Sequence, residues 1–216
     1  MNEHQLAQIQ CIVEGALLAA GKPMTVDQLR ELFDESERPA RQVIEHVLTL
    51  IDKACEGRGF ELKQVASGYR FQVREAYAPW VGRLFEERPQ RYSRALLETL
   101  ALIAYRQPIT RGEIEDIRGV TVSSNIMRTL LEREWVRIVG HRDVPGRPAM
   151  YATTRQFLDY FNLTNLDQLP PLADVRDLDE ISREIEAQVQ GEIDFSPSDT
   201  VQAQDDVDGD SEQTLH

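Results

Sequence analysis

Residues 17–29 read LLAAGKPMTVDQL, and residues 102–114, which lie 85 positions further on, read LIAYRQPITRGEI. In both copies an apolar helical run meets a proline, which lacks an N–H and cannot continue a helix. An apolar residue follows, and then a threonine, a residue type that favours the start of a new helix. A helix, a tight turn and a second short helix, repeated at this spacing, predict two tandem helix-turn-helix units.

Strand patterns follow the first unit. Pro39 suits a first helical turn and predicts a third helix from there to about Lys53. Residues 60–65 and 69–73 then alternate with period two around the turn Ala66-Ser67-Gly68, which predicts a β-hairpin. Three helices followed by a hairpin are typical of a winged helix.

The second unit repeats this order. Ser93 is expected to cap a helix to about Tyr105, Thr110 the next helix, and Ser123 or Ser124 a third helix through Arg133. Two strands are expected at residues 135–139 and 150–153, and Thr154 is expected to cap a short aromatic helix over residues 157–161. The predicted fold class is therefore mainly α with small β wings, in two tandem winged-helix domains with a disordered acidic C-terminal tail.

The charge is concentrated at one end of the chain. The net charge is −13, yet residues 173–216 alone carry 14 acidic and 2 basic residues, and residues 88–172 carry a net charge of +3. A segment so acidic and so poor in aliphatic residues is expected to be disordered from residue 191. The expected divisions are 1–74 for the first winged-helix domain, 75–92 for a partly helical linker, 93–172 for the second domain, 173–190 for an acidic amphipathic helix and 191–216 for the tail.

Several classes of protein are excluded by what the sequence lacks. No apolar run reaches membrane-spanning length, and the first residues lack the basic region and apolar core of a signal peptide, so we expect neither a membrane span nor a signal peptide. The two cysteines, Cys11 and Cys55, are too few for a disulfide framework and indicate a cytoplasmic protein. The four histidines are scattered, and no nucleophile motif, metal-ligand spacing or phosphate-binding loop occurs. We expect a binding protein with no enzymatic activity, cofactor or metal.

The third helix of a helix-turn-helix unit often reads DNA, and it then carries side chains that match base edges. The outward residues of the second unit's third helix include Asn125, Arg128 and Glu132, so one or two suitable donors stand beside a glutamate that would face phosphate. An ordinary solvated face is the better interpretation. A sequence-specific DNA-binding transcriptional regulator therefore remains only the alternative, and DNA binding is expected to be weak, non-specific and limited to the second domain.

The first helix of each unit carries more apolar residues than one packing face requires. Nine of the eleven residues from 95 to 105 are apolar, which is wider than the stripe of a helix that packs only on its own small domain. Residues 12–20 show the same excess less strongly. A second packing partner is implied, although a helix central to its own domain would give the same pattern.

The run LLETLALIAYRQPITRGEIEDIRGV at residues 96–120 resembles the bacterial segregation and condensation protein B (ScpB) family. So does GRPAMYATTRQFLDYF at residues 146–161. The likeness extends over about residues 5–172, closely in the second unit and loosely in the first. Ala152 and Asn162 stand where many members have glycine, so the turn near the last helix is expected to differ locally.

The resemblance implies a non-catalytic, tandem winged-helix protein that forms a homodimer, mainly through its first domain. It implies that the kleisin ScpA is the partner and that ScpA in turn bridges an SMC ATPase. The assembly is a condensin-like complex that acts in chromosome condensation, partition and segregation during the cell cycle and cell division. The implied location is the cytoplasm, in association with the nucleoid.

Two sets of contact residues follow from these expectations. A kleisin site is predicted on the second domain, where Tyr105 ends the apolar helix and Arg147 stands in a restricted loop. The predicted kleisin-binding residues are Tyr105, Arg106, Gln107, Arg147, Tyr151 and Phe157. Tyr151 and Phe157 would serve equally as core residues. The predicted dimer contacts are Leu18, Phe33 and Trp80, each of which is also explicable as local core.

Overall fold

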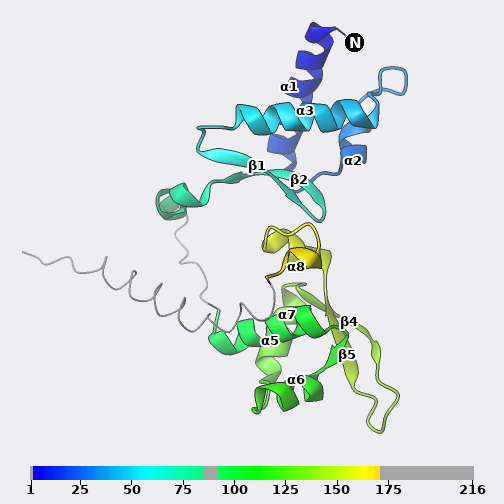
Figure 1. Ribbon diagram of the computed structural model, residues 1–216, viewed down its shortest axis with the longest axis vertical. Coiled ribbons are helices and arrows are strands. Elements are labelled where there is room, and N and C mark those ends of the chain that lie inside the picture. The colour runs from blue at the N-terminus through cyan, green and yellow to red at the C-terminus, as the bar shows by residue number, and fades with distance from the viewer. Residues whose placement is uncertain (1, 85–91, 171–216) are drawn as a thin grey trace, which may run out of the picture. The chain divides into compact units, whose positions relative to one another are not determined.

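The computed structural model describes residues 2–84 and 92–170 (Figure 1). The described chain is mainly helical with two small sheets, and its order of three helices followed by a hairpin occurs twice. The first set is α1 (Glu3–Ala20), α2 (Val26–Arg30), α3 (Arg41–Ala54), β1 (Phe60–Val65) and β2 (Gly68–Val73). The second set is α5 (Arg94–Arg106), β3 (Ile109–Thr110), α6 (Arg111–Arg118), α7 (Ser124–Glu132), β4 (Val136–His141), β5 (Ala149–Thr153) and α8 (Arg155–Tyr160).

Between the two sets lie short helical segments, namely η1 (Glu75–Tyr77), α4 (Ala78–Val81) and η2 (Gly82–Leu84). Residues 75–84 are therefore partly helical. A last short helical turn, η3 (Leu166–Gln168), closes the described chain. The expectations for residues 85–91, 173–190 and 191–216 lie outside the described residues.

Capping side chains fix the starts of the first two helices, α1 and α2. Asn2 and Gln5 form a reciprocal capping box at α1, and Thr25 and Gln28 form another at α2, as the threonine predicted. The prediction for Pro39 was wrong, because α3 begins only at Arg41 and the carbonyl of Pro39 accepts a hydrogen bond from Arg30 Nε at 3.0 Å. The proline therefore ends the preceding loop.

The β1–β2 hairpin packs onto the turn between the first two helices. Met24 and Tyr69 exchange backbone hydrogen bonds of 2.9 and 2.8 Å across an isolated bridge. Gly68, beside Tyr69, has a φ of +131°, and a Cβ there would stand 2.1 Å from the carbonyl oxygen of Met24. Only glycine allows the backbone to come this close to Met24, so Gly68 permits the hairpin to pack against the turn between the helices.

The second set has a larger sheet than the sequence predicted. Its strand order is β3-β5-β4, and β3 is a two-residue strand between α5 and α6 in which Ile109 pairs with Tyr151. This strand is the counterpart of the Met24–Tyr69 bridge, but it is too short to leave a period-two pattern. Ser93, Thr110, Ser123 and Thr154 all cap helices, as expected.

Residues 1–170 form one compact unit with two hydrophobic clusters, one for each set of helices. Polar contacts connect the hairpin turn to the end of α8. Asp159, which is buried, accepts a hydrogen bond from the Ser67 N–H at 2.9 Å, while Arg70 Nη2 donates to the carbonyl of Asp159 and to Oδ1 of Asn162. Asn162 has a φ of +58°, a left-handed conformation that asparagine tolerates in place of the expected glycine.

Candidate partner-binding surfaces

Three of the predicted kleisin-binding residues lie at the end of α5. Gln107 is partly buried and its Oε1 accepts hydrogen bonds from the N–H of Thr153 at 2.7 Å and from its hydroxyl at 3.0 Å. Its Nε2 donates to the carbonyl of Ala104. The Tyr105 hydroxyl donates to the carbonyl of Pro170, and Arg106 is exposed. Gln107 thus ties the end of α5 to β5, and Arg106 presents a cation beside it.

Phe157 is part of the core and is only 4% exposed. Its N–H is held by the hydroxyl of Thr154, and its ring packs against Phe161 with centroids 5.0 Å apart. A partner therefore has no access to it, and the second interpretation of this residue, plain core, is the right one. Tyr151 is half-buried and packs against the same cluster from the middle of β5.

Arg147 lies apart from the residues at the end of α5. It is exposed in the loop between β4 and β5, where its φ is +41° and its N–H donates to the carbonyl of Val144. Gln107 contacts Thr153 at one end of β5, and the loop joins Ala149 at the other end. The strand between them is roughly 14 Å long at ~3.4 Å per residue, so the six residues do not form one cluster.

A groove lies beside α8 on the second set of helices, and we refer to it as the α8 groove. One part has a volume of about 670 Å³ and is lined by Gln107, Arg137, Ala152, Thr153, Thr154, Arg155, Leu158 and Leu166. The adjoining part, of about 540 Å³, is lined by Leu131, Glu134, Val136, Arg137, Ile138, Thr154, Arg155 and Gln156. The two parts share Arg137, Thr154 and Arg155, so they are continuous.

The α8 groove combines cations with apolar walls. Arg137 and Arg155 are exposed, and neither has an acidic partner among the ion pairs of residues 2–84 and 92–170, whereas Glu134 contributes the one carboxylate of the lining. Sequence reasoning missed both arginines. The signal that could have indicated them was their position: Arg155 directly follows the helix cap Thr154, and Arg137 lies in the predicted strand 135–139.

On the first set of helices, α1 leaves an apolar face uncovered. We define the α1 face as the exposed residues Cys11, Ile12, Gly15, Leu18 and Ala19. Leu18 is 65% exposed, and a Cβ added at Gly15 would meet nothing within 4 Å. Of the other predicted dimer contacts, Trp80 is 64% exposed on α4, while Phe33 is half-buried against the core and lines a hollow next to Ile12.

The apolar residues of α5, by contrast, are covered by the helices and strands of its own set. Leu96, Thr99, Leu100, Ile103 and Ala104 are buried, and Leu97 is the one exposed large apolar residue of the helix. The alternative interpretation, a helix central to its own domain, therefore accounts for the apolar pattern of α5. The weaker signal, from residues 12–20, marks the helix with free apolar surface.

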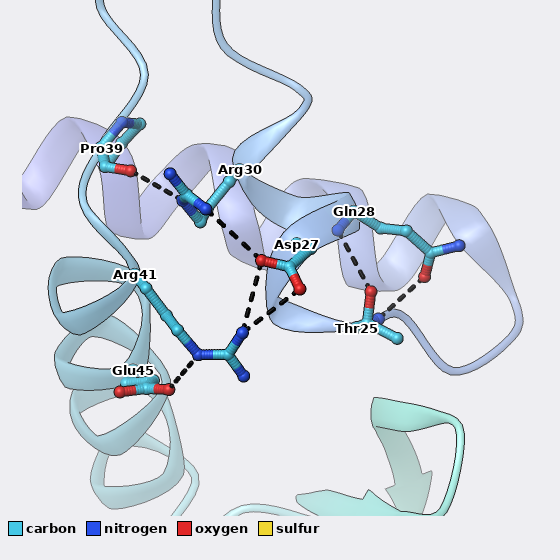
Figure 2. Close-up of polar contacts among 7 residues, drawn as sticks. All are labelled: Thr25, Asp27, Gln28, Arg30, Pro39, Arg41 and Glu45. Atoms are coloured by element: carbon cyan, nitrogen blue, oxygen red, sulfur yellow. Dashed lines mark hydrogen bonds and ion pairs between the residues drawn. The ribbon is translucent and has the colours of Figure 1, made fainter.

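The exposed arginines of the third helices already have partners. Figure 2 shows Arg41 of α3 between Asp27 and Glu45, with Nη1–Oδ2 and Nε–Oε1 distances of 3.2 and 2.9 Å. The hydrogen bond to Glu45 raises the pKa of the Arg41 guanidinium. On α7, Arg128 Nη2 donates to Asn125 Oδ1 at 2.7 Å, and its Nε lies 4.0 Å from Glu132. Carboxylates on both faces oppose the approach of phosphate.

Within the described ranges no three His, Cys, Asp or Glu side chains gather as metal ligands. None of the helices described is both long and apolar enough to cross a membrane.

The chain matches the model of a protein family described as segregation and condensation complex subunit ScpB over residues 11–172. The segregation and condensation protein B homolog of Coxiella burnetii is 53% identical over 178 residues, which cover 82% of this chain and 85% of that protein. Segregation and condensation protein B of Syntrophotalea carbinolica is 42% identical over 171 residues, 79% of this chain and 85% of the relative. The crystal structure of ScpB from Mycobacterium tuberculosis is 34% identical, covers 74% of this chain and 98% of its own, and has a TM-score of 0.34.

Proposed function

Because the chain belongs to the family of the segregation and condensation complex subunit ScpB, we propose that it is a non-catalytic subunit of a condensin-like SMC complex. In this role it binds the kleisin ScpA, which bridges the SMC ATPase, and acts in chromosome condensation and segregation during cell division. The proposed location is the cytoplasm, at the nucleoid. Residues 1–74 are assigned to dimerisation and residues 93–172 to kleisin binding.

The observation that carries the kleisin assignment is the α8 groove. It is open, it has apolar side chains from Leu158 and Leu166, and it presents two arginines that have no acidic partner among residues 2–84 and 92–170. Arginine is enriched at protein interfaces because its apolar stem packs while its guanidinium binds carboxylates and carbonyls. The proposed contact retains Tyr105, Arg106, Gln107, Arg147 and Tyr151, adds Arg137 and Arg155, and omits the buried Phe157.

The α1 face supports the proposed homodimer. Small residues at Gly15 and Ala19 allow a second helix to approach closely, and Ile12 and Leu18 supply the apolar area. Such a contact is self-complementary when the same face is used by both copies around a two-fold axis.

The alternative function, a sequence-specific transcriptional regulator, lacks support at the helices that would read DNA. The ion pairs of Arg41 in Figure 2 and the contacts of Arg128 leave carboxylates on both reading faces. Direct DNA binding is proposed to be weak and independent of sequence. Its affinity should fall steeply with salt, because phosphate contacts release counterions.

Calorimetric titration of the full chain with purified ScpA tests the proposal. We expect saturable binding that survives physiological salt, and competing DNA fragments should not displace ScpA. If ScpA does not bind while an operator fragment binds selectively at physiological salt, the regulator is the correct function.

A further inference from the structure

We propose that the outer edge of β4 binds an extended acidic segment of the partner protein as an added β-strand. This inference rests on the proposed function, since the partner is taken to be the kleisin. Its first support is the strand order β3-β5-β4, which leaves β4 paired on one side only. An unpaired edge offers backbone N–H and C=O groups to any extended chain that reaches it.

The hydrogen-bond pattern identifies the free backbone groups. The Thr154 N–H donates to the carbonyl of Trp135 at 3.1 Å, and the register then pairs Val136 with Thr153, Arg137 with Ala152 and Ile138 with Tyr151. Antiparallel pairs alternate between bonded and non-bonded, so the backbone groups of Val136 and Ile138 point away from β5. The Thr153 N–H supports this assignment, because it points away from β4 and donates to Gln107 instead.

The side chains around this edge suit a strand with alternating acidic and apolar residues. Ile138 is 50% exposed and lines the α8 groove together with Leu131. Arg137 and Arg155 flank the same part of the groove and have no acidic partners among the described residues. Charge complementarity therefore selects an acidic segment, whose carboxylates would pair with the two guanidinium groups and whose apolar residues would cover Ile138.

A bulge between Ile138 and Gly140 interrupts the register of β4 with β5. Bulges twist an edge and end regular pairing. The added strand is therefore short and is limited to the stretch before the bulge, where the groove and its two arginines lie.

The test compares charge reversal at the groove with the same charge change elsewhere. The full chain, the Arg137→Glu/Arg155→Glu variant and the control Arg38→Glu/Arg128→Glu are titrated with purified ScpA. Both control residues are exposed and lie outside the α8 groove. We expect the dissociation constant to rise about tenfold or more for the groove variant and to stay within about twofold for the control. Equal effects of the two variants would overturn the proposal.

Strand addition itself is tested by the amides. When the wild-type chain is saturated with ScpA, hydrogen exchange at the backbone amides of Val136 and Ile138 should slow at least about tenfold. In a separate titration, Ile138→Pro should weaken ScpA binding more than Ile138→Ala, because only proline removes the N–H. Unchanged exchange would overturn strand addition even if the arginines matter. A lower oligomer mass of the groove variant would assign the edge to a second copy. If the wild-type chain fails to bind ScpA, the proposed function falls first and this inference with it.

Discussion

Helices α1 and α5 begin the two repeated sets and have similar sequence patterns, yet they differ in what covers them. Helix α5 packs against α6, α7 and β5, and five of its residues are buried. Helix α1 packs against α3 and β2, and only Val13 and Leu17 are buried. Helix α5, which has the denser apolar composition, is the one whose apolar residues are buried by the helices and strands of its own set. Apolar content alone therefore does not identify an interface, because burial depends on which elements pack against the helix.

The largest expected effect tests the burial of α5 within its own set of helices. Ile103→Ala removes a fully buried side chain of α5 and should destabilise the protein by about 2–5 kcal/mol, because the cavity cannot fill. Leu18→Ala, on the exposed α1 face, should change stability by no more than about 0.5 kcal/mol when measured below the concentration at which the chain dimerises. Urea unfolding followed by tryptophan fluorescence measures both. Equal losses would contradict the difference between the helices.

A smaller effect is expected at Gly15, in the middle of α1. An added Cβ meets nothing within 4 Å, so Gly15→Ala should stabilise the isolated monomer by up to about 1 kcal/mol through helix propensity. The same methyl group would keep a second α1 helix from approaching closely, and the dimer should weaken. Thermal unfolding at low concentration and sedimentation at high concentration separate the two effects. A dimer of unchanged strength would show that Gly15 lies outside the contact.

The smallest effect concerns a carboxylate of α5. Hydrogen bonds from Arg94 and then from Arg118 lower the pKa of Glu98 below its ordinary value of 4.5. A carboxyl group with a lowered folded-state pKa stabilises the fold above its unfolded pKa, and this stabilisation is lost as the pH falls from about 4.5 through the folded value. Since Glu98 is 43% exposed, solvent screening limits the effect to about 0.5 kcal/mol or less.

The comparison variant for this carboxylate is Glu98→Gln, with unfolding free energies measured at pH 7 and pH 3.5. The wild type should lose slightly more stability than the variant over this interval. A variant that loses as much as the wild type would show that the ion pairs of Glu98 contribute nothing measurable.

Much of the fold could be predicted from local chemistry. The threonines and serines at positions 25, 93, 110, 123 and 154 all cap helices, because each cap depends on residues within one turn of chain. The strand β3 could not be predicted, since two residues are too few to show the alternation of apolar and polar residues that marks a strand. Pro39 was misplaced because its carbonyl is held by Arg30, a tertiary contact that local propensity does not contain.

The candidate site was less predictable for the same physical reason. Tyr105 and Arg147 were expected to be exposed; Arg147 is, whereas Tyr105 is half-buried. Phe157 is core, because its ring packs against Phe161, which in turn packs against Trp135. Arg137 and Arg155 come from different elements, and only the pairing of β4 with β5 brings them to one groove. Because the groove is assembled from separate elements, no single motif of the sequence marks it as a whole.

The measurement that tests the central claim most directly is the mass of the particle in solution. Sedimentation equilibrium at tens of micromolar compares the wild-type chain with Leu18→Arg on α1 and with the matched variant Leu97→Arg, which changes the exposed leucine of α5. We predict a dimer for the wild type and for Leu97→Arg, and a monomer for Leu18→Arg, because a charge buried in an apolar contact is strongly unfavourable. A dimeric Leu18→Arg variant together with a monomeric Leu97→Arg variant would contradict the account.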